Sequence, residues 1–365
     1  MKEDTRVGPE LTIGVDLGDR YSHLCVVDEH GEVCEEGRIA TTARAMRKRF
    51  EGMARCRVVI EVGSHSPWVQ RLLDELGHEV ITAHTQAVRL IYGGTNKNDR
   101  LDAERLARLG RVDPKLLHPI RHRDGSVQAD RAVIRSRHVL VGCRTNLINH
   151  ARGMVKSMGG RLPACSAESF HKRAGTDLPD ELKPALLPVL ETITSLTQEI
   201  RRYDQRIETL ALERYPETNL LRQVSGVGSV TALSYVLTVE DPRRFSKSRS
   251  LGAYLGLQPR RSQSGDNDPE LRVTKTGDDD LRRLLVNAAH YVLGPFGPDT
   301  NLRRWGLALA DRGRKNAKKR AVVAVARKLA VLLHRLWVTG EVYEPLRTQP
   351  RRLNISNSIA QAIPA

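Results

Sequence analysis

The stretches "LTIGVDLG" (residues 11–18) and "YSHLCVVDEHGEV" (residues 21–33) decide the fold of the N-terminal region. Each contains apolar and β-branched residues, and a short glycine-containing segment joins them, which predicts two strands in a hairpin. The segment "DEHG" lies at the far end of the second strand. "CRVVIEVG" (residues 56–63) is a nearly continuous apolar run, as expected for a strand in the interior of a sheet.

Helical patterns alternate with these strands. "SPWVQRLLDELGHE" (residues 66–79) predicts a helix that ends at Gly77, and "EVITAH" (residues 79–84) predicts a further strand. "NDRLDAERLARLGR" (residues 98–111) predicts a second helix, with leucines between charged residues. This order of elements predicts an α/β domain over residues 1–127.

The middle of the chain, residues 128–213, has a helical pattern, and residues 158–180 form the predicted connecting loop. A seam of residues recurs at three- and four-residue steps: Leu186, Leu190, Ile193, Thr197, Ile200, Tyr203, Ile207 and Leu210. The seam predicts a helical hairpin or a coiled coil between molecules. A helix packed on its own domain would give the same pattern.

A third region, residues 214–345, is predicted to be mainly helical. "LLRQVSGVGSVTALSYVLTV" (residues 220–239) indicates a helix, a glycine-rich turn and a second helix. "NAKKRAVVAVARKLAVLLHRLWVTG" (residues 316–340) predicts a long basic helix that stops at its final glycine. Residues 346–365 are predicted to be a disordered tail.

The chain is strongly basic, with a formal net charge of +16. Residues 301–352 alone hold 14 Lys and Arg against 3 Asp and Glu. Such a concentration favours a polyanionic partner, although a soluble basic protein without a specific partner is the alternative. Aromatic residues make up only 4% of the chain, so phosphate contacts are expected to outweigh base stacking.

Neither a membrane span nor a signal peptide is expected, because no apolar run reaches about 18 residues and the N-terminal segment is polar. The five cysteines are widely spaced without a CxxC motif, which indicates a reducing compartment and neither a disulfide framework nor a zinc site. We expect a cytoplasmic, nucleoid-associated protein.

Four carboxylates stand at informative positions. Asp16 and Glu61 end two predicted strands near glycines, and Asp99 and Asp102 lie at i and i+3 on one helix. Taken alone, the helical pair could be an N-cap and a first-turn acid that the helix dipole favours. Four carboxylates brought together would instead hold a hard divalent cation. The order of strands and acids is that of a ribonuclease-H-like fold.

These segments resemble the N-terminal RuvC-like DEDD domain of the IS-one-ten family of insertion-sequence transposases. "LRQVSGVGSVTALSYVLTVEDPRRFSKSRSLGAYLGLQPRRSQSG", "KTGDDDLRRLLVNAA" and "AVVAVARKLAVLLHRLW" resemble the C-terminal transposase domain of the same family. The resemblance implies a RuvC/ribonuclease-H-like α/β domain, a helical coiled-coil middle and a mainly α C-terminal domain with a helix-hairpin-helix-like turn. It makes Asp16, Glu61, Asp99 and Asp102 the ligands of Mg²⁺.

The loop "GLQPRRSQSGDND" (residues 256–268) contains two serines, and chemistry alone does not mark either as a nucleophile. The resemblance assigns the catalytic role to Ser264, which precedes a glycine, and leaves Ser262 in reserve. Arg260 and Arg261 suit the scissile phosphate, because guanidinium groups bind phosphate through two hydrogen bonds. A solvated pair of loop arginines is the alternative.

Two further features are predicted to bind nucleic acid. The turn at Gly226 and Gly228 offers backbone N–H groups at a helix N-terminus, although a tight turn between helices without a ligand is the alternative. The long basic helix offers a set of cations for phosphate contacts: Lys315, Lys318, Lys319 and Arg320.

The resemblance implies a DNA transposase or recombinase of a bacterial or archaeal insertion sequence. The implied reaction is Mg²⁺-dependent cleavage and exchange of donor and target DNA through a covalent phosphoserine intermediate. A structured guide RNA and a homodimer or homotetramer are also implied. Two other readings of the chain stay open, namely a RuvC-like junction endonuclease without serine chemistry and a non-catalytic nucleic-acid-binding remnant.

Overall fold

The computed structural model describes residues 10–85, 98–265, 267, 269, 271–313 and 316–346. The chain divides into two compact units, residues 1–124 and residues 125–365. The finer division into four segments stays a prediction, and the predicted disordered tail lies outside the described residues except for Leu346.

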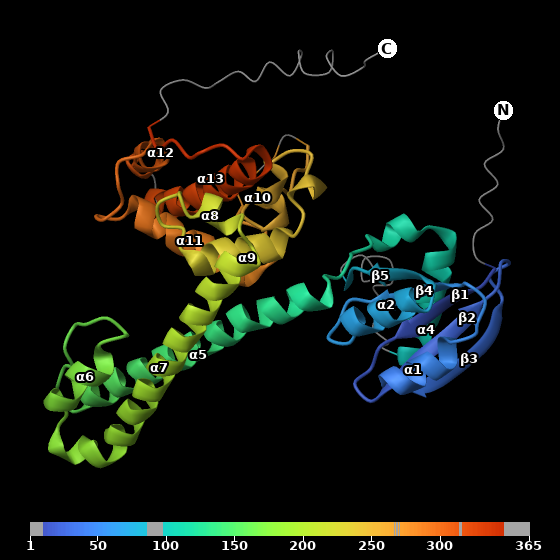
Figure 1. Cartoon of the computed structure of the whole chain (residues 1–365), viewed down its shortest axis with the longest axis horizontal. Helices are drawn as coiled ribbons and strands as arrows, with labels where there is room; N and C mark the ends of the chain where they lie inside the picture. Colours follow the sequence, from blue (N-terminus) through green and yellow to red (C-terminus); the bar gives the residue numbers. More distant parts are fainter. Residues whose placement is uncertain are drawn as a thin grey trace, which may run out of the picture. The chain divides into compact units, whose positions relative to one another are not determined.

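The first unit is a five-stranded mixed sheet with helices (Figure 1). Its elements are β1 (Thr12–Asp16), β2 (Tyr21–Val27), β3 (Val33–Ala40), α1 (Ala43–Phe50), β4 (Arg57–Glu61), α2 (Ser66–Glu75), β5 (Glu79–Ala83), α4 (Asp99–Val112) and the 3₁₀ helix η1 (Pro114–Leu117). The strand order is β3-β2-β1-β4-β5. β1 pairs antiparallel with β2 and parallel with β4, so the first three strands form a meander beside a parallel pair.

The two faces of the sheet bury different helices. Ile13 and Val15 of β1 belong to a core that includes Met46 and Phe50 of α1 and Val69 of α2. Because side chains alternate along a strand, the residues between them face the other way, toward α4. That second face carries small buried contacts, as between Cys25, Val27, Ala103 and Ala107.

Helix α4 lies directly on β1. A Cβ atom added to Gly14 would stand 1.9 Å from the Ala103 carbonyl oxygen and 2.5 Å from the Ala107 nitrogen. Further along the helix, the Gly110 carbonyl accepts a hydrogen bond at 3.0 Å from Arg57, the first residue of β4. The C-terminal part of α4 therefore lies near the start of β4, and its first turn lies toward the carboxyl ends of the parallel strands.

The sequence missed β3 and α1. Strand β3 reads "VCEEGRIA", and its burial pattern contains no buried residue, which is typical of an exposed strand at the edge of a sheet. Such a strand lacks the apolar alternation from which a strand is recognised. Helix α1 is only eight residues long and buries two side chains, Met46 and Phe50, which is too short a stripe for a clear period.

The second unit is mostly helical. Its elements are α5 (Gly125–Ser157), α6 (Phe170–Ala174), η2 (Gly175–Asp177), η3 (Asp180–Leu182), α7 (Lys183–Glu213), α8 (Thr218–Leu221), α9 (Ser229–Val239), η4 (Pro242–Arg244), α10 (Ser250–Tyr254), α11 (Asp279–Leu293), α12 (Asn301–Ala310) and α13 (Ala317–Thr339). None of the helices within the described residues is both long and apolar enough to span a membrane.

The two long helices α5 and α7 pack against each other (Figure 1). Leu186 and Ile193 of the predicted seam are buried in a cluster that includes Ile148 of α5, and Ile207 is buried beside Ile134 of the same helix. These parts of the seam therefore contact α5 of the same chain, which is the packing that the sequence pattern left as the alternative. A coiled coil between molecules stays a prediction.

A single apolar core joins α9, α11 and α13. Tyr235 of α9 is fully buried and its hydroxyl donates to the Ala330 carbonyl of α13 at 2.7 Å. Helix α13 ends at Gly340, whose φ of 66° lies in the left-handed region, as the sequence predicted. The loops that connect these helices therefore begin and end on a packed core.

Gly14→Ala is expected to destabilise the first unit by about 3 kcal/mol, because the added methyl group overlaps the α4 backbone, which cannot move without opening the sheet. Chemical denaturation followed by circular dichroism would measure the change. Gly63→Ala is the control, since a Cβ atom at Gly63 meets no atom within 4 Å. Equal stability of the two variants would contradict the close packing of α4 on β1.

Candidate active site

Asp16 and Glu61 stand side by side at the carboxyl ends of two parallel strands. The register pairs Val15 with Ile60, so the next residue on each strand is one of the two acids. Alternation gives Asp16 the same face as Gly14, which contacts α4, and gives Glu61 the same face as Val59, which contacts Gly110 of α4. Both carboxylates therefore belong to the face of the sheet that α4 covers.

The loops that follow these two strands are tied to each other. His65, which comes after β4, lies with its Nε2 atom 3.8 Å from a carboxylate oxygen of Asp19, which comes after β1. The indole N–H of Trp68 donates to Nδ1 of His65 at 3.1 Å. Since an indole nitrogen is only a donor, this bond leaves the His65 proton on Nε2, toward Asp19.

A buried serine shapes the loop after Glu61. The Ser66 hydroxyl accepts from the Gly63 N–H and lies 2.8 Å from Nε2 of His122. Burial lowers the pKa of His122, and the positive charges of Arg71 and Arg123 lower it further. A neutral His122 therefore holds Ser66 and fixes the turn that follows the second acid.

Another histidine lies next to the acidic pair. His23 of β2 is the cross-strand partner of Asp16, and Arg38 of β3 is in turn the partner of His23. The Arg38 guanidinium lies 4.4 Å from the centre of the half-exposed Tyr21 ring. This row was not predicted from the sequence, because it follows from the register between strands and not from the pattern of any one strand.

Asp99 and Asp102 occupy the first turn of α4, as the sequence predicted. The side chain of Asn98 caps the helix by accepting from the Arg100 N–H at 3.1 Å, so neither aspartate is the N-cap. Asp102 is half-buried and accepts from Arg105 at 3.0 Å. The side chains of Glu61 and Asp99 form no hydrogen bond or ion pair with any residue that the structure describes.

The four acids do not form one closed cluster here. In the part of the chain that the structure describes, no three His, Cys, Asp or Glu side chains lie close enough to hold a metal ion. Bringing two carboxylates to 5 Å would cost about 3 kcal/mol of repulsion at an effective dielectric constant of about 20. The dipole of a helix returns only about 0.3–1 kcal/mol to each acid in its first turn. The donor set nevertheless fits a hard divalent cation, because it is all oxygen and two of the acids have no described partner.

Ser264 lies at the tip of a two-stranded arm in the second unit, which we call the serine arm (residues 257–276). The N–H of Thr274 donates to Gln258 at 2.9 Å, and the N–H of Arg260 donates to Arg272 at 2.9 Å. Ser264 and Asn267 exchange two backbone hydrogen bonds of 3.1 Å, which close the tip. The side chain of Ser264 is exposed, as a nucleophile that attacks a large polymer must be.

The other candidates in the serine arm are also exposed. Ser262, Arg260 and Arg261 all lie on its surface, between the base of the arm and Ser264. Gly265 has a φ of 56°, and nothing lies within 4 Å of the Cβ atom it lacks, so its glycine serves the turn rather than a close contact. The arm thus presents two serines and two cations to solvent within five residues.

The glycine-rich turn before α9 combines two different glycines. Gly226 has a φ of 87°, and its missing Cβ atom would stand 3.1 Å from Tyr291 and from the Ala288 carbonyl of α11. Gly228 is exposed, has extended backbone and has open space at its Cβ position. Packing therefore explains why a glycine stands at position 226 but not why one stands at 228. Because Gly228 has no side chain, the backbone at the start of α9 is accessible.

A carboxylate that was not predicted from the sequence lies beside this turn. Glu208 of α7 accepts hydrogen bonds from the Ser229 hydroxyl and, at 2.6 Å, from Arg222. The Ser229 hydroxyl, and then Arg222, hold the pKa of Glu208 below its usual value. The negative charge of Glu208 near the start of α9 is therefore partly compensated by Arg222, which lowers its repulsion of an approaching anion.

Three of the four predicted cations of the basic helix are exposed at its first turns. Lys318, Lys319 and Arg320 follow the N-cap Asn316 of α13, and no acid lies in the first turn. Lys315 lies outside the described residues. Cations at the N-terminus of a helix repel the positive end of its dipole, and they raise the electrostatic potential there. A bound polyanion would lower this repulsion.

Two family profiles match the chain. One, of a DEDD-type domain described as "Transposase", matches residues 13–159, and the other, described as "Transposase IS116/IS110/IS902 family", matches residues 218–301. They cover the acidic site of the first unit and the serine arm with its glycine-rich turn.

Curated transposases are similar over most of their length. The transposase for insertion sequence element IS1111A of Coxiella burnetii is 29% identical over 339 residues, which cover 91% of this chain and 90% of that protein. The transposase for insertion sequence element IS1328 of Yersinia enterocolitica is 27% identical over 352 residues, 92% of this chain and 99% of that protein. The putative transposase y4pF/y4sB of Sinorhizobium fredii is 30% identical over 319 residues, 84% of this chain and 79% of that protein.

The fold, the acids and these similarities define a transposase. The chain belongs to the IS116/IS110/IS902 family, as the motifs predicted. Membership implies an enzyme that cleaves and recombines DNA, so DNA is a partner. The DEDD type of the first domain indicates that a divalent metal ion is used.

Gly228→Ala is expected to weaken DNA binding by about tenfold, the equivalent of one charge-assisted hydrogen bond, because its methyl group stands where a phosphate would approach. Stability should change by only about 0.5 kcal/mol, since any residue adopts the backbone of Gly228. Fluorescence anisotropy at fixed salt would measure the affinity.

Gly226→Ala is the contrasting variant, which strains a left-handed backbone and should lose stability instead. Unchanged affinity in Gly228→Ala would assign the turn to helix packing alone.

Proposed function

We propose that this transposase exchanges DNA strands through a covalent phosphoserine intermediate formed on Ser264. The observation that carries the proposal is the exposed Ser264 at the tip of a polar arm. In the first unit of the same family member, Asp16 and Glu61 lie side by side at the carboxyl ends of two parallel strands. The strand order β3-β2-β1-β4-β5, with the acids at the ends of β1 and β4, supports a RuvC/ribonuclease-H-like assignment of that unit.

Asp16, Glu61, Asp99 and Asp102 would hold Mg²⁺ through their carboxylate oxygens. A bound Mg²⁺ supplies positive charge that stabilises a phosphate as its charge grows in the transition state. The acids of the sheet are fixed by the parallel register, whereas Asp102 must exchange its contact with Arg105 for the cation. A divalent cation bound together with DNA would offset the repulsion between the four carboxylates.

Ser264 would attack a scissile phosphodiester. Its hydroxyl oxygen forms a bond to phosphorus, its proton passes to a base or to solvent, and the bond to one DNA oxygen breaks. A DNA hydroxyl then attacks the same phosphorus and releases the serine, so the number of phosphodiester bonds is conserved and no nucleotide is hydrolysed. Arg260 and Arg261 lie on the same arm and suit the phosphate oxygens.

The partners follow from the reaction. Donor and target DNA are both required, and one serine for each cleaved strand calls for a homodimer or a homotetramer. Exposed Lys318, Lys319 and Arg320 suit backbone phosphates of any sequence. A structured guide RNA would supply the sequence recognition that phosphate contacts lack.

Asp102→Asn should abolish strand exchange while nucleic-acid binding stays within about twofold, because binding relies on the basic surface and not on the acids. Recombination of a two-site plasmid in Mg²⁺ and a parallel binding assay would measure the two effects. Glu104→Gln is the matched control, since Glu104 forms a comparable ion pair with Arg108 on the same helix. Recombination at the wild-type rate in Asp102→Asn would remove Asp102 from the metal site.

Ser264→Ala should abolish the covalent protein–DNA adduct and all recombination, whereas stability should change by less than about 0.5 kcal/mol because the side chain is exposed. A suicide DNA substrate and denaturing gel electrophoresis would detect the adduct. Ser262→Ala, two residues away on the same arm, should keep substantial activity.

An adduct that persists in Ser264→Ala and disappears in Ser262→Ala would transfer the nucleophile to Ser262. DNA cleavage without any adduct in the wild type would favour a metal-dependent nuclease that activates water.

A further inference from the structure

The two ends of the serine arm meet in direct backbone contact. Gly256 and Gly277 both have left-handed backbone, with φ of 64° and 77°. A Cβ atom at Gly256 would stand 2.3 Å from the Thr276 carbonyl oxygen, and one at Gly277 would stand 2.0 Å from that of Tyr254. The two strands are therefore in close contact at the base of the arm, because neither glycine has a side chain that would separate their backbones.

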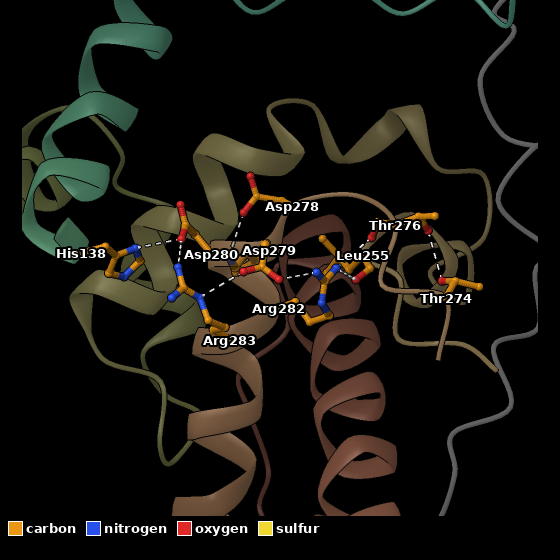
Figure 2. Close-up of polar contacts among 10 residues, drawn as sticks. His138, Leu255, Thr274, Thr276, Asp278, Asp279, Asp280, Arg282 and Arg283 are labelled. Carbon is orange, nitrogen blue, oxygen red and sulfur yellow. Dashed lines mark hydrogen bonds and ion pairs between the residues drawn. The ribbon is translucent and has the colours of Figure 1, made fainter. Parts of the chain in front are cut away.

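One buried guanidinium bridges this base (Figure 2). Nη1 of Arg282 donates to the Leu255 carbonyl at 3.1 Å and to the Thr276 carbonyl at 2.9 Å, which are the residues just before the two glycines. Nη2 donates to Asp279 at 2.5 Å, which compensates the charge. Only 8% of Arg282 is exposed, so losing it would leave two carbonyls without these donors.

Helix α11, which carries Arg282, is itself anchored. Its N-cap Asp278 accepts from the Leu281 N–H at 2.8 Å and pairs with Arg131 of α5. Asp280 lies 3.5 Å from His138, also on α5 (Figure 2). Arg282 therefore connects the arm to a helix that is fixed at its start.

The rest of the arm has little to hold it. Residues 259–265 are all exposed, and a two-stranded ribbon is at best marginally stable by itself. The direction in which the tip points is consequently set at the base, where small rotations are magnified over the length of the arm. A group that fixes the base fixes the position of Ser264.

We propose that Arg282 is the positioning residue of the serine arm, holding both of its ends so that Ser264 meets the scissile phosphate in line. The inference rests on the proposed serine chemistry and adds a residue that does not touch the DNA. The spacing of Asp279 and Arg282 within "KTGDDDLRR" is the sequence signature of this clamp.

The test compares Arg282→Gln with Arg283→Gln in the full-length protein. Arg283 is the matched control, because its side chain is 62% exposed and pairs with Asp279 and Asp280 but with no described residue of the arm. The initial rate of adduct formation at saturating suicide DNA should fall about 100-fold in Arg282→Gln, as expected for a misplaced reacting group. DNA affinity should stay within about twofold, and Arg283→Gln should react within about threefold of the wild type.

Hydrogen exchange provides a readout that does not depend on chemistry. The amides of Arg260 and Thr274 are bonded across the arm, so they should exchange slowly in the wild type and faster in Arg282→Gln, while amides of α13 keep their protection. Guanidinium ion at low millimolar concentration should restore adduct formation to Arg282→Ala and not to Ser264→Ala. If Arg282→Gln fails to fold, Arg282→Lys, which keeps the charge without the fork of donors, takes its place and should show the same losses in smaller measure.

Wild-type adduct rates together with wild-type protection in the Arg282 variants would overturn the inference. Lost protection with an unchanged adduct rate would also overturn it, since the base of the arm would then not position the serine. If the wild type itself forms no adduct, the proposed serine chemistry fails, and Arg282 is then not a positioning residue for it even where exchange shows that it orders the arm.

Discussion

The acidic site depends on the contact between α4 and β1 at Gly14. Because no side chain separates the two backbones there, the helix lies against the sheet with the Ala103 carbonyl facing the strand. Gly110 leaves room for the Val59 side chain of β4, and this second contact fixes the direction of the helix. The first turn, with Asp99 and Asp102, is thereby held toward the strand ends where Asp16 and Glu61 stand. A bulkier residue at either glycine would move the helix and separate the two pairs of acids.

The elements that carry this arrangement could be predicted because their patterns are local. The apolar runs of β1, β2 and β4, the first-turn acids of α4 and the glycine that ends α13 are each determined within a few residues. Strand β3 could not be found because its partner, β2, supplies the hydrogen bonds while none of its own side chains is fully buried. The pairing of Asp16 with His23 needs the register, and a register is a property of two strands.

Long-range polar contacts escaped the sequence for the same reason. Nothing near Glu208 in the sequence indicates that it would meet Ser229, and nothing near Leu255 indicates a donor 27 residues further on. The heptad-like seam of α7 gave the buried face correctly but not its partner, since a helix of the same chain and a helix of another molecule demand the same apolar stripe. The sequence thus identified candidate residues, but it did not predict which residues they contact in space.

The two halves of the proposed chemistry, the metal site and the serine, make opposite demands on the fold. Carboxylates that share a cation need a rigid frame, because their mutual repulsion of about 3 kcal/mol per close pair would otherwise push them apart. Parallel strand ends and a helix without intervening side chains supply that frame. A serine that must reach a phosphate on a bulky polymer has to project from the surface, and an exposed arm does this at the expense of its own packing. The clamp of Arg282 on the Leu255 and Thr276 carbonyls reconciles the two demands, since it concentrates the rigidity at the base and leaves the tip open to DNA.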